Sequence, residues 1–310
     1  MAEWGQLSTE ASNPASRDLD TLAPEDVVSL LLEEDRRGLD ATLQHTREIA
    51  RAATWAAETL AGGGKVLFAG AGTSGRLGIL EAAECPPTFG TDPDDIRACI
   101  AGGREAVFAA HEGAEDVLSD GAAAAKDLGS GDLLVGISAS SVTPYVVGAL
   151  EAARAGGART VLVTCAPIDE TPAVADLVLA LDTGPEVLTG STRLKAGSAT
   201  KAVLNAITTA AMVQLGKVYG NLMVDLRPGS AKLQDRALRI IHAAGAVSRE
   251  EAERLHQAAG GEVKTAIVMA RSGLGAEPAR KRLRVAGGQV RKALEDPPEP
   301  EEGGANDFQK

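Results

Sequence analysis

KVLFAGAGTSGRLGILEAAECPPTFG, Lys65 to Gly90, decides the fold of this chain. It begins with an apolar run, Val66–Ala69, which predicts a buried strand and leads into a glycine-rich turn with two adjacent hydroxyls, Thr73 and Ser74. The residues after the turn predict a helix. Because such a turn directs backbone N–H groups and the start of a helix toward one point, the segment favours binding of a phosphate group.

The alternation of strand and helix continues after Gly90. The apolar runs are short, apolar on both faces and separated by helical stretches, which is typical of a parallel sheet covered on both sides. The expected strands are Val66–Ala69, Ile96–Ala101, Leu133–Ser138, Thr160–Cys165 and Leu177–Leu181. The expected helices are Ser74–Ala83, Arg104–Leu128, Pro144–Ala155 and Ala196–Gly220. The fold class is therefore α/β, a parallel sheet flanked by helices.

The sequence divides into four segments. Residues 1–62 are expected to form an N-terminal helical segment, because Pro24 suits the first turn of a helix and apolar residues then recur at helical spacing, which predicts two helices. Residues 63–228 form the sheet domain, and residues 229–296 form a small all-helical domain. Its expected helices are Leu233–Ala243, Arg249–Ala259, Val263–Ala270 and Pro278–Leu294. The acidic residues 297–310, rich in proline and glycine, are expected to be disordered.

Charge and composition exclude several kinds of partner. The formal net charge is −12, from 31 basic and 43 acidic residues, which argues against a nucleic-acid or anionic membrane surface. No apolar stretch reaches the ~18 residues of a membrane span, and the acidic start lacks the features of a signal peptide, so we expect a cytoplasmic protein. Cys85, Cys99 and Cys165 show no metal or disulfide spacing and are expected to be buried free thiols.

Gly70, Gly72 and Gly75 satisfy the dinucleotide pattern G-x-G-x-x-G. That pattern also requires an acidic residue at the end of the second strand, to bind a ribose hydroxyl. The second expected strand, IRACIAGG, ends in alanine and glycines, which disfavours a nicotinamide or flavin cofactor. A tight turn without any ligand is the other alternative.

A second cluster of hydroxyls favours a ligand. The strand Leu133–Ser138 continues into SASSVTP, which carries Ser138, Ser140, Ser141 and Thr143 ahead of Pro144. One hydroxyl is enough to cap a helix, and four favour a bound phosphate at the carboxyl ends of the strands, where open α/β sheets bind ligands. A third polar loop, LTGSTRLKAGSATK, offers Ser191, Thr192, Arg193 and Lys195 to an anionic substrate, with a basic surface turn as its alternative.

Three glutamates are candidates for acid–base work, with solvated surface carboxylates as the alternative. Glu84 stands before Pro86 and Pro87, which we expect to end the helix. Glu112 and Glu115 are expected to share one face of the following helix. His111 precedes Glu112, but the second histidine of a zinc-binding H-E-x-x-H helix is absent and the other three histidines are scattered, so no metal site is expected.

Together these residues resemble the N-acetylmuramic acid 6-phosphate etherase family, which has the sugar isomerase (SIS) fold. The motifs that carry the resemblance are GAGTSGRLGILEAAECPPTFG, EGAED, TPYV, TGSTRLKAGSATK and GNLMVD. It extends from TEASNPASRDLD through GKVYGNLMVDL and weakens in the C-terminal helices, where EVKTAIVM is still similar. The resemblance implies a SIS-type sheet and a lyase of cell-wall sugar recycling. The lyase would cleave the ether between carbon 3 of the sugar phosphate and D-lactate, by elimination and then water addition, leaving N-acetylglucosamine 6-phosphate.

The resemblance also implies roles for single residues. The two catalytic glutamates of the family correspond to Glu84, as the acid, and Glu115, as the base, an order that the sequence alone does not distinguish. The residues that correspond to the phosphate pocket are Ser74, Ser138, Ser140 and Thr143. From the polar loops we add Gly72, Thr73, Ser191 and Lys195 to the expected binding residues. The family implies no metal and no cofactor, a homodimer, and a small sugar phosphate as the partner.

The chain departs from the family at one place. The family usually reads A-S-G-R-T-P, and here the glycine and arginine are Ser141 and Val142. A serine is expected to resist the positive φ that glycine permits, and the valine removes a cation that could meet the sugar phosphate. Two other functions therefore stay open: an aldose–ketose isomerase, and a sugar-phosphate sensor without turnover, as in the related glucokinase regulatory proteins. We also expect the N-terminal segment and the C-terminal helices to help close the pocket on a partner subunit.

Overall fold

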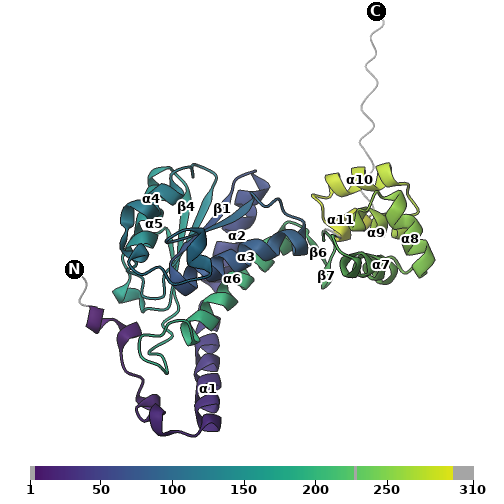
Figure 1. Cartoon of the computed structure of the whole chain (residues 1–310). Coiled ribbons are helices and arrows are strands. Elements are labelled where there is room, and N and C mark those ends of the chain that lie inside the picture. Colours follow the sequence, from purple (N-terminus) through teal and green to yellow (C-terminus); the bar gives the residue numbers. More distant parts are fainter. Residues whose placement is uncertain (1–3, 227–228, 296–310) are drawn as a thin grey trace, which may run out of the picture. The chain divides into compact units, whose positions relative to one another are not determined.

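The structure, a computed structural model, describes residues 4–226 and 229–295. The chain divides into two compact units, Met1–Leu215 and Gly216–Lys310 (Figure 1). This division lies ahead of the expected boundary between residues 228 and 229. The reason is a short antiparallel hairpin, β6 (Val218–Tyr219) and β7 (Leu222–Met223), whose side chains pack against the apolar core of the second unit.

Five parallel strands form the sheet of the first unit in the order β2-β1-β3-β4-β5. They are β1 (Val66–Gly70), β2 (Ile96–Ile100), β3 (Leu133–Ile137), β4 (Arg159–Thr164) and β5 (Leu177–Ala180). Every residue of β1 and β3 is buried, which accounts for their continuous apolar runs. The predicted parallel sheet is confirmed, and each strand begins and ends within one residue of its predicted bounds.

Helices cover both faces of this sheet (Figure 1). Successive strand residues face opposite sides, so Leu67 and Ala69 join a core cluster with the helices α4 and α5, whereas Phe68 lies against Gly78 of α3. The helix α3 also packs against α6, which in turn contacts α1 and α2. The bounds of these helices are α1 (Pro24–Leu43), α2 (Thr46–Ala61), α3 (Gly72–Phe89), α4 (Leu118–Ala125), α5 (Pro144–Ala155) and α6 (Lys195–Gln214).

The strand order places a switch point between β1 and β3. From β1 the chain runs through α3 to β2 on one side, and β3 continues through α5 to β4 on the other side. Because α3 and α5 leave toward opposite faces of the sheet, a crevice opens at the carboxyl ends of β1 and β3. The two hydroxyl-bearing turns singled out in the sequence meet at this crevice.

The helix predicted over Arg104–Leu128 is wrong. The structure has two short 3-10 turns, η5 (Arg104–Val107) and η6 (Ala114–Asp116), before α4 begins at Leu118. Gly113 separates them with a φ of 76°, a left-handed conformation that a continuous helix does not contain. The prediction that Glu112 and Glu115 share a helix face is therefore also wrong.

The prolines after Glu84 do not end their helix. The helix α3 continues through Pro86 and Pro87 to Phe89 and ends at Gly90, which has a φ of 66° and donates its N–H to the carbonyl of Pro86. Proline has a helical φ, so Pro86 and Pro87 fit this helix, but they lack the N–H donors that would bond the carbonyls of Ala82 and Ala83. Glu84 consequently lies on a helix and is exposed.

The remaining elements follow the predictions with three differences. Four 3-10 turns precede α1 in the N-terminal segment: η1 (Trp4–Gln6), η2 (Ser8–Glu10), η3 (Pro14–Ser16) and η4 (Leu19–Thr21). The helix α6 stops at Gln214 rather than Gly220, because Gly216 takes a φ of 70° and the hairpin follows. The expected helix Pro278–Leu294 is two helices, since Gly287 and Gly288 both have positive φ. The helices of the second unit are α7 (Ala231–Gly245), α8 (Arg249–Ala258), α9 (Val263–Ser272), α10 (Ala276–Val285) and α11 (Val290–Leu294).

The three cysteines are free thiols, with Cys85 and Cys165 buried and Cys99 partly buried. Burial, together with the charges of Glu81 and Glu84, raises the pKa of Cys85 to about 12. The acidic tail predicted at residues 297–310 lies outside the described residues.

Candidate active site

A cavity of about 310 Å³ lies at the crevice between β1 and β3. Five parts of the first unit line it: the turn after β1, the turn after β3, the 3-10 turn η6, a segment near the N-terminus, and the loop before α6. The lining residues are Leu7, Thr9, Glu10, Ala71, Gly72, Thr73, Ser74, Glu115, Asp116, Ile137, Ala139, Ser140, Thr143, Pro144, Gly190 and Thr192. The fold thus brings five of the predicted binding residues and one of the two predicted catalytic glutamates to one place.

The turn after β1 presents the start of α3 to this cavity. A side chain at Gly70 would place its Cβ 2.7 Å from the backbone nitrogen of Gly75, so the glycine pattern serves the close approach of helix and strand. Thr73 and Ser74 stand in the first turn of α3, where backbone N–H groups have no partner inside the helix. Among the described residues, neither hydroxyl makes a hydrogen bond, which leaves both for a ligand.

The turn after β3 presents the start of α5. Ser140 and Thr143 line the cavity. Ser138 is buried behind them, and its Oγ lies 2.8 Å from Oγ1 of Thr143, so it supports Thr143 rather than facing the cavity. The two helix N-termini and these hydroxyls make this part of the cavity lining suited to an anion.

Ser141 adopts the conformation that we expected it to resist. Its φ is 69°, and its fully buried hydroxyl donates a 3.0 Å hydrogen bond to the carbonyl oxygen of Glu170. The hydrogen bond offsets the cost of a left-handed serine, so the turn keeps the shape that a glycine would give it.

Two substitutions at this position are expected to separate strain from hydrogen bonding. Ser141→Gly relieves the strain and loses the bond, so the free energy of unfolding should change by less than about 1 kcal/mol. Ser141→Ala keeps the strain and loses the bond, and should lower the free energy of unfolding by about 1–3 kcal/mol. Urea unfolding followed by circular dichroism measures both. Equal stability of the two variants would contradict the account.

Three carboxylates from two segments also line the cavity. Glu115 lines it together with Asp116 and Glu10. Glu115 also lines an adjoining cavity of about 180 Å³ with Arg76, His111 and Glu112. The shared position of Glu115 gives it access to both spaces, and it is exposed in the single chain.

Glu84 lies elsewhere in the single chain. It is 12 residues beyond Gly72 on α3, which corresponds to about 18 Å along the helix axis. It lines neither the 310 Å³ nor the 180 Å³ cavity. One copy of the chain therefore separates the two glutamates that the resemblance implied as a pair.

Lys195 also lies away from the cavity. Its ammonium is buried and lies 2.6 Å from a carboxylate oxygen of Glu34 on α1 and 2.8 Å from the carbonyl oxygen of Pro185. Burial favours the neutral form of Glu34, but the hydrogen bond and charge of Lys195 outweigh it and hold the pKa of Glu34 below its ordinary value. In the single chain this ion pair fastens α1 to α6.

At the start of α6, a carboxylate of the chain itself accepts the backbone N–H groups that could otherwise bind a ligand. Glu186 accepts the backbone N–H groups of Lys195 at 3.1 Å and of Ala196 at 2.9 Å. Burial raises the pKa of Glu186, although these two bonds oppose the shift. Ser191 lies between Gly190 and Thr192, which line the cavity, and is not itself a lining residue. The third polar loop thus contributes Thr192 and Gly190 rather than Ser191 and Lys195.

Sequence reasoning missed the N-terminal wall and Asp116. Thr9 and Glu10 belong to the motif TEASNPASRDLD, which is part of the family resemblance but for which no function was predicted. Asp116 directly follows Glu115 in EGAED. No local pattern in the sequence indicates that residues 7–10 lie beside the turns after β1 and β3, because that contact spans more than 60 positions of the chain.

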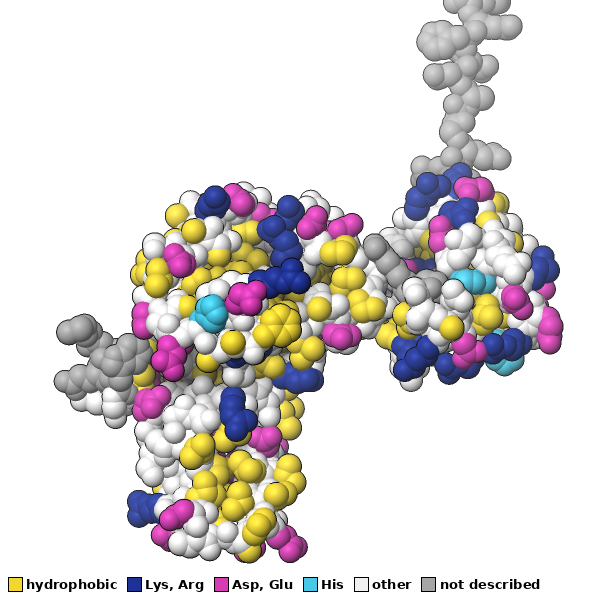
Figure 2. Space-filling view, in the orientation of Figure 1, with side chains coloured by type: hydrophobic (Ala, Val, Ile, Leu, Met, Phe, Trp, Pro, Cys, Tyr) yellow, Lys and Arg dark blue, Asp and Glu magenta, His cyan; other side chains and the backbone are white. Residues whose placement is uncertain are grey.

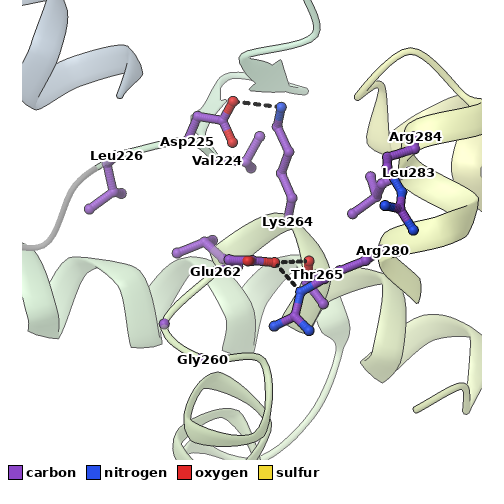
Figure 3. Close-up of a pocket in the computed structure, with 12 residues that line it drawn as sticks. Val224, Asp225, Leu226, Gly260, Glu262, Lys264, Thr265, Arg280, Leu283 and Arg284 are labelled. Carbon is purple, nitrogen blue, oxygen red and sulfur yellow. Dashed lines mark hydrogen bonds and ion pairs between the residues drawn. The ribbon is translucent and has the colours of Figure 1, made fainter. Parts of the chain in front are cut away.

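The second unit has a cavity of its own, of about 480 Å³ (Figure 3). Lys264 lies 2.6 Å from Asp225, and burial lowers the pKa of its ammonium, which the charge of Asp225 opposes. Glu262 accepts hydrogen bonds from Thr265 and Arg280, which fastens α9 to α10. These charges are paired with each other, so this part of EVKTAIVM has a structural role within the unit.

The described residues offer neither a metal cluster nor a membrane-spanning helix. No group of three or more His, Cys, Asp or Glu side chains among them is arranged to hold a metal ion. Within residues 4–226 and 229–295, no helix combines the length and apolar character needed to cross a bilayer.

Comparison with known proteins gives similarities over part of the chain and over nearly all of it. The family model of the glucokinase regulatory protein N-terminal SIS domain matches residues 48–154. The N-acetylmuramic acid 6-phosphate etherase of Cutibacterium acnes is 49% identical over 93% of this chain and 96% of its own length. The protein of that name from Synechocystis sp. is 46% identical over 96% of this chain and 98% of its own. Among solved structures, the sugar isomerase domain of the RpiR transcription factor from Sphaerobacter thermophilus matches with a TM-score of 0.43 and 19% identity, over 61% of this chain and 90% of that one.

Proposed function

Because the chain belongs to the N-acetylmuramic acid 6-phosphate etherase family, we propose that it cleaves the D-lactyl ether of N-acetylmuramic acid 6-phosphate to N-acetylglucosamine 6-phosphate and D-lactate. One observation supports this most: Glu115 shares a cavity with two helix N-termini and their hydroxyls. A phosphate-binding end and a carboxylate are what proton abstraction from a sugar phosphate requires.

The charges and hydroxyls that line the cavity suggest how the substrate is oriented. The phosphate would bind at Thr73, Ser74, Ser140 and Thr143, where N–H groups and hydroxyls donate hydrogen bonds. The acids Glu10, Glu115 and Asp116, which line the same cavity, would repel the phosphate from their side of it. The open-chain sugar would then extend toward Glu115.

The reaction needs a base and an acid. The aldehyde of the open-chain sugar acidifies the proton on carbon 2, and Glu115 would remove it. The ether oxygen on carbon 3 leaves as D-lactate after it receives a proton from Glu84, and water then adds to the unsaturated aldehyde at carbon 3. Two carboxyl groups in different environments can divide these tasks. Since Glu84 of the same chain lies too far along α3, we propose that Glu84 acts from a second copy of the chain.

Exposed apolar side chains support a homodimer. Val28, Leu32, Leu39 and Leu43 are 54%, 65%, 42% and 67% exposed and fall within an arc of about 60° on α1. Figure 2 shows hydrophobic side chains gathered at the lower end of the first unit, where Figure 1 draws α1. Leu80 is 43% exposed and stands one turn before Glu84 on the same side of α3. A second copy that covers these side chains would bring Glu84 into an interface.

Charged substitutions on α1 test the dimer. The double variant Leu32→Glu, Leu43→Glu should elute as a monomer from a sizing column and lose more than about 90% of lactate release, because buried unpaired carboxylates disrupt an apolar interface. Glu33→Lys, an exposed charge change off that arc, is the matched control and should stay dimeric. A wild-type chain that is monomeric and active would overturn the proposed dimer.

Labelled water tests the reaction itself. Incubation of the wild-type protein with N-acetylmuramic acid 6-phosphate in H₂¹⁸O should release D-lactate and place the label on carbon 3 of the product. In D₂O, deuterium should appear at carbon 2. Lactate carrying the label, or no lactate, would refute the elimination. An aldose–ketose isomerase would release no lactate and would form a ketose instead.

A sugar-phosphate sensor is the second candidate. Val142, where the family has arginine, and the match to a regulatory protein's SIS domain favour it. A sensor would bind the sugar phosphate without turnover, so the same incubation separates the two.

We further propose that the protein works in the cytoplasm on small sugar phosphates, without nucleic acid, which its net charge of −12 supports.

A further inference from the structure

The N-terminal segment Leu7–Glu10 forms a wall of the substrate cavity at a fixed place. The backbone N–H and the hydroxyl of Ser8 both donate to one carboxylate oxygen of Glu170, at 3.1 and 3.0 Å. Further along, Nδ2 of Asn13 donates to Glu34 at 3.0 Å and to the carbonyl oxygen of Pro185 at 3.1 Å. Bonds on both sides of Thr9 therefore hold it against the cavity.

Thr9 has a polar group without a partner. Its side chain is 3% exposed, and Oγ1 is one of the buried side-chain oxygens that make no hydrogen bond among the described residues. A buried hydroxyl without a partner costs free energy in the folded state. Because Thr9 lines the cavity, a bound ligand can supply the missing hydrogen bond.

The surroundings of Thr9 indicate which part of a ligand it meets. Glu10 follows it and lies over Gly190, where a Cβ would come within 2.9 Å of a carboxylate oxygen of Glu10. Within the described part of the chain, the Glu10 carboxylate has neither an ion pair nor a hydrogen bond. A carboxylate beside the hydroxyl disfavours an anionic group there and favours neutral hydroxyl or amide donors.

We propose that Thr9 is a substrate-binding residue whose hydroxyl forms a hydrogen bond with a hydroxyl or acetamido group of the amino-sugar phosphate. This rests on the proposed function of the cavity and adds the N-terminal wall to it. The strap from Ser8 to Asn13 holds the hydroxyl in place before the ligand arrives, so little ordering is required on binding.

Threonine and valine have nearly the same shape, which makes Thr9→Val the decisive variant. It should raise KM for N-acetylmuramic acid 6-phosphate by about tenfold to a hundredfold, the loss of one or two good hydrogen bonds. Its melting temperature without ligand should equal or exceed that of the wild type, because the unsatisfied hydroxyl is gone. Thr9→Ser keeps the hydroxyl and should retain a KM near that of the wild type.

Thr91 provides the matched control. It is buried, 5% exposed, and its Oγ1 also has no partner among the described residues, but it follows α3 at the end remote from the cavity. Thr91→Val should leave KM unchanged. The shift in melting temperature caused by N-acetylglucosamine 6-phosphate gives a second readout, which should shrink in Thr9→Val alone.

The outcomes separate this inference from the proposed function. If the wild type releases no lactate, the proposed function fails, and the shift with the sugar phosphate still tests Thr9. If the wild type is active and Thr9→Val keeps its KM within about twofold, the inference is refuted. Loss of thermal stability in both Thr9→Val and Thr9→Ser would also refute it, because that result indicates a structural role.

Discussion

Glu115→Gln should lower kcat for lactate release by about 10²–10⁴-fold, the range that a positioned general base contributes. Glutamine preserves the size of the side chain and cannot accept the proton from carbon 2. KM should change little, because the proposed phosphate-binding turns, at the starts of α3 and α5, are untouched. Deuterium uptake at carbon 2 from D₂O should be lost together with lactate release, which mass spectrometry of the product measures.

Glu112→Gln is the control for that experiment. Glu112 stands three residues earlier and lines the adjoining cavity, but it does not line the cavity with the two hydroxyl-bearing turns. The Glu112→Gln variant should retain a kcat for lactate release within a few-fold of the wild type. If Glu112→Gln were inactive and Glu115→Gln active, the base would be the other glutamate of this segment.

Mixing two inactive variants should restore activity if Glu84 acts across a dimer. Glu84→Gln and Glu115→Gln homodimers each have two defective sites. After subunit exchange, about half of the dimers are mixed, and each mixed dimer has one complete site, so activity should recover to about a quarter of the wild type. Lactate release measured against the mixing ratio gives the result.

The control mixes Glu84→Gln with a chain that carries both substitutions, where no complete site can form. That mixture should stay inactive. No recovery in the first mixture, despite subunit exchange shown by a tagged copy, would contradict action from the partner. In that case Asp116 and Glu10, which already line the cavity, become the candidates for the acid.

The sheet and the two hydroxyl-bearing turns could be predicted because their signals are local. A buried parallel strand is a short apolar run, and a turn that presents a helix start carries its glycines and hydroxyls in sequence order, as in Gly70 to Ser74 and Ser138 to Thr143. The strand bounds and the cavity at the ends of β1 and β3 follow from such patterns.

The predictions from the sequence that were wrong failed for non-local or conformational reasons. Residues 104–128 have helical composition, but Gly113 takes a left-handed conformation that composition does not indicate. Pro86 and Pro87 remain inside α3 because the φ of proline is helical, although each removes one N–H donor. Lys195 was predicted to bind an anionic substrate, but α1 places Glu34 beside it. The two residues are 161 positions apart in the chain. Such pairings depend on the folded topology.

Glu170 holds two walls of the cavity at once. Its side chain binds Ser8 of the N-terminal strap, and its carbonyl oxygen binds Ser141 in the turn after β3. The two walls are therefore coupled. When thermal motion or a mutation displaces one of them, Glu170 moves and its hydrogen bond to the other wall changes as well. If the protein were evolved to accept bulkier sugar phosphates, substitutions at residues 8 and 141 would both act through their hydrogen bonds to Glu170. Their effects on activity should therefore combine non-additively.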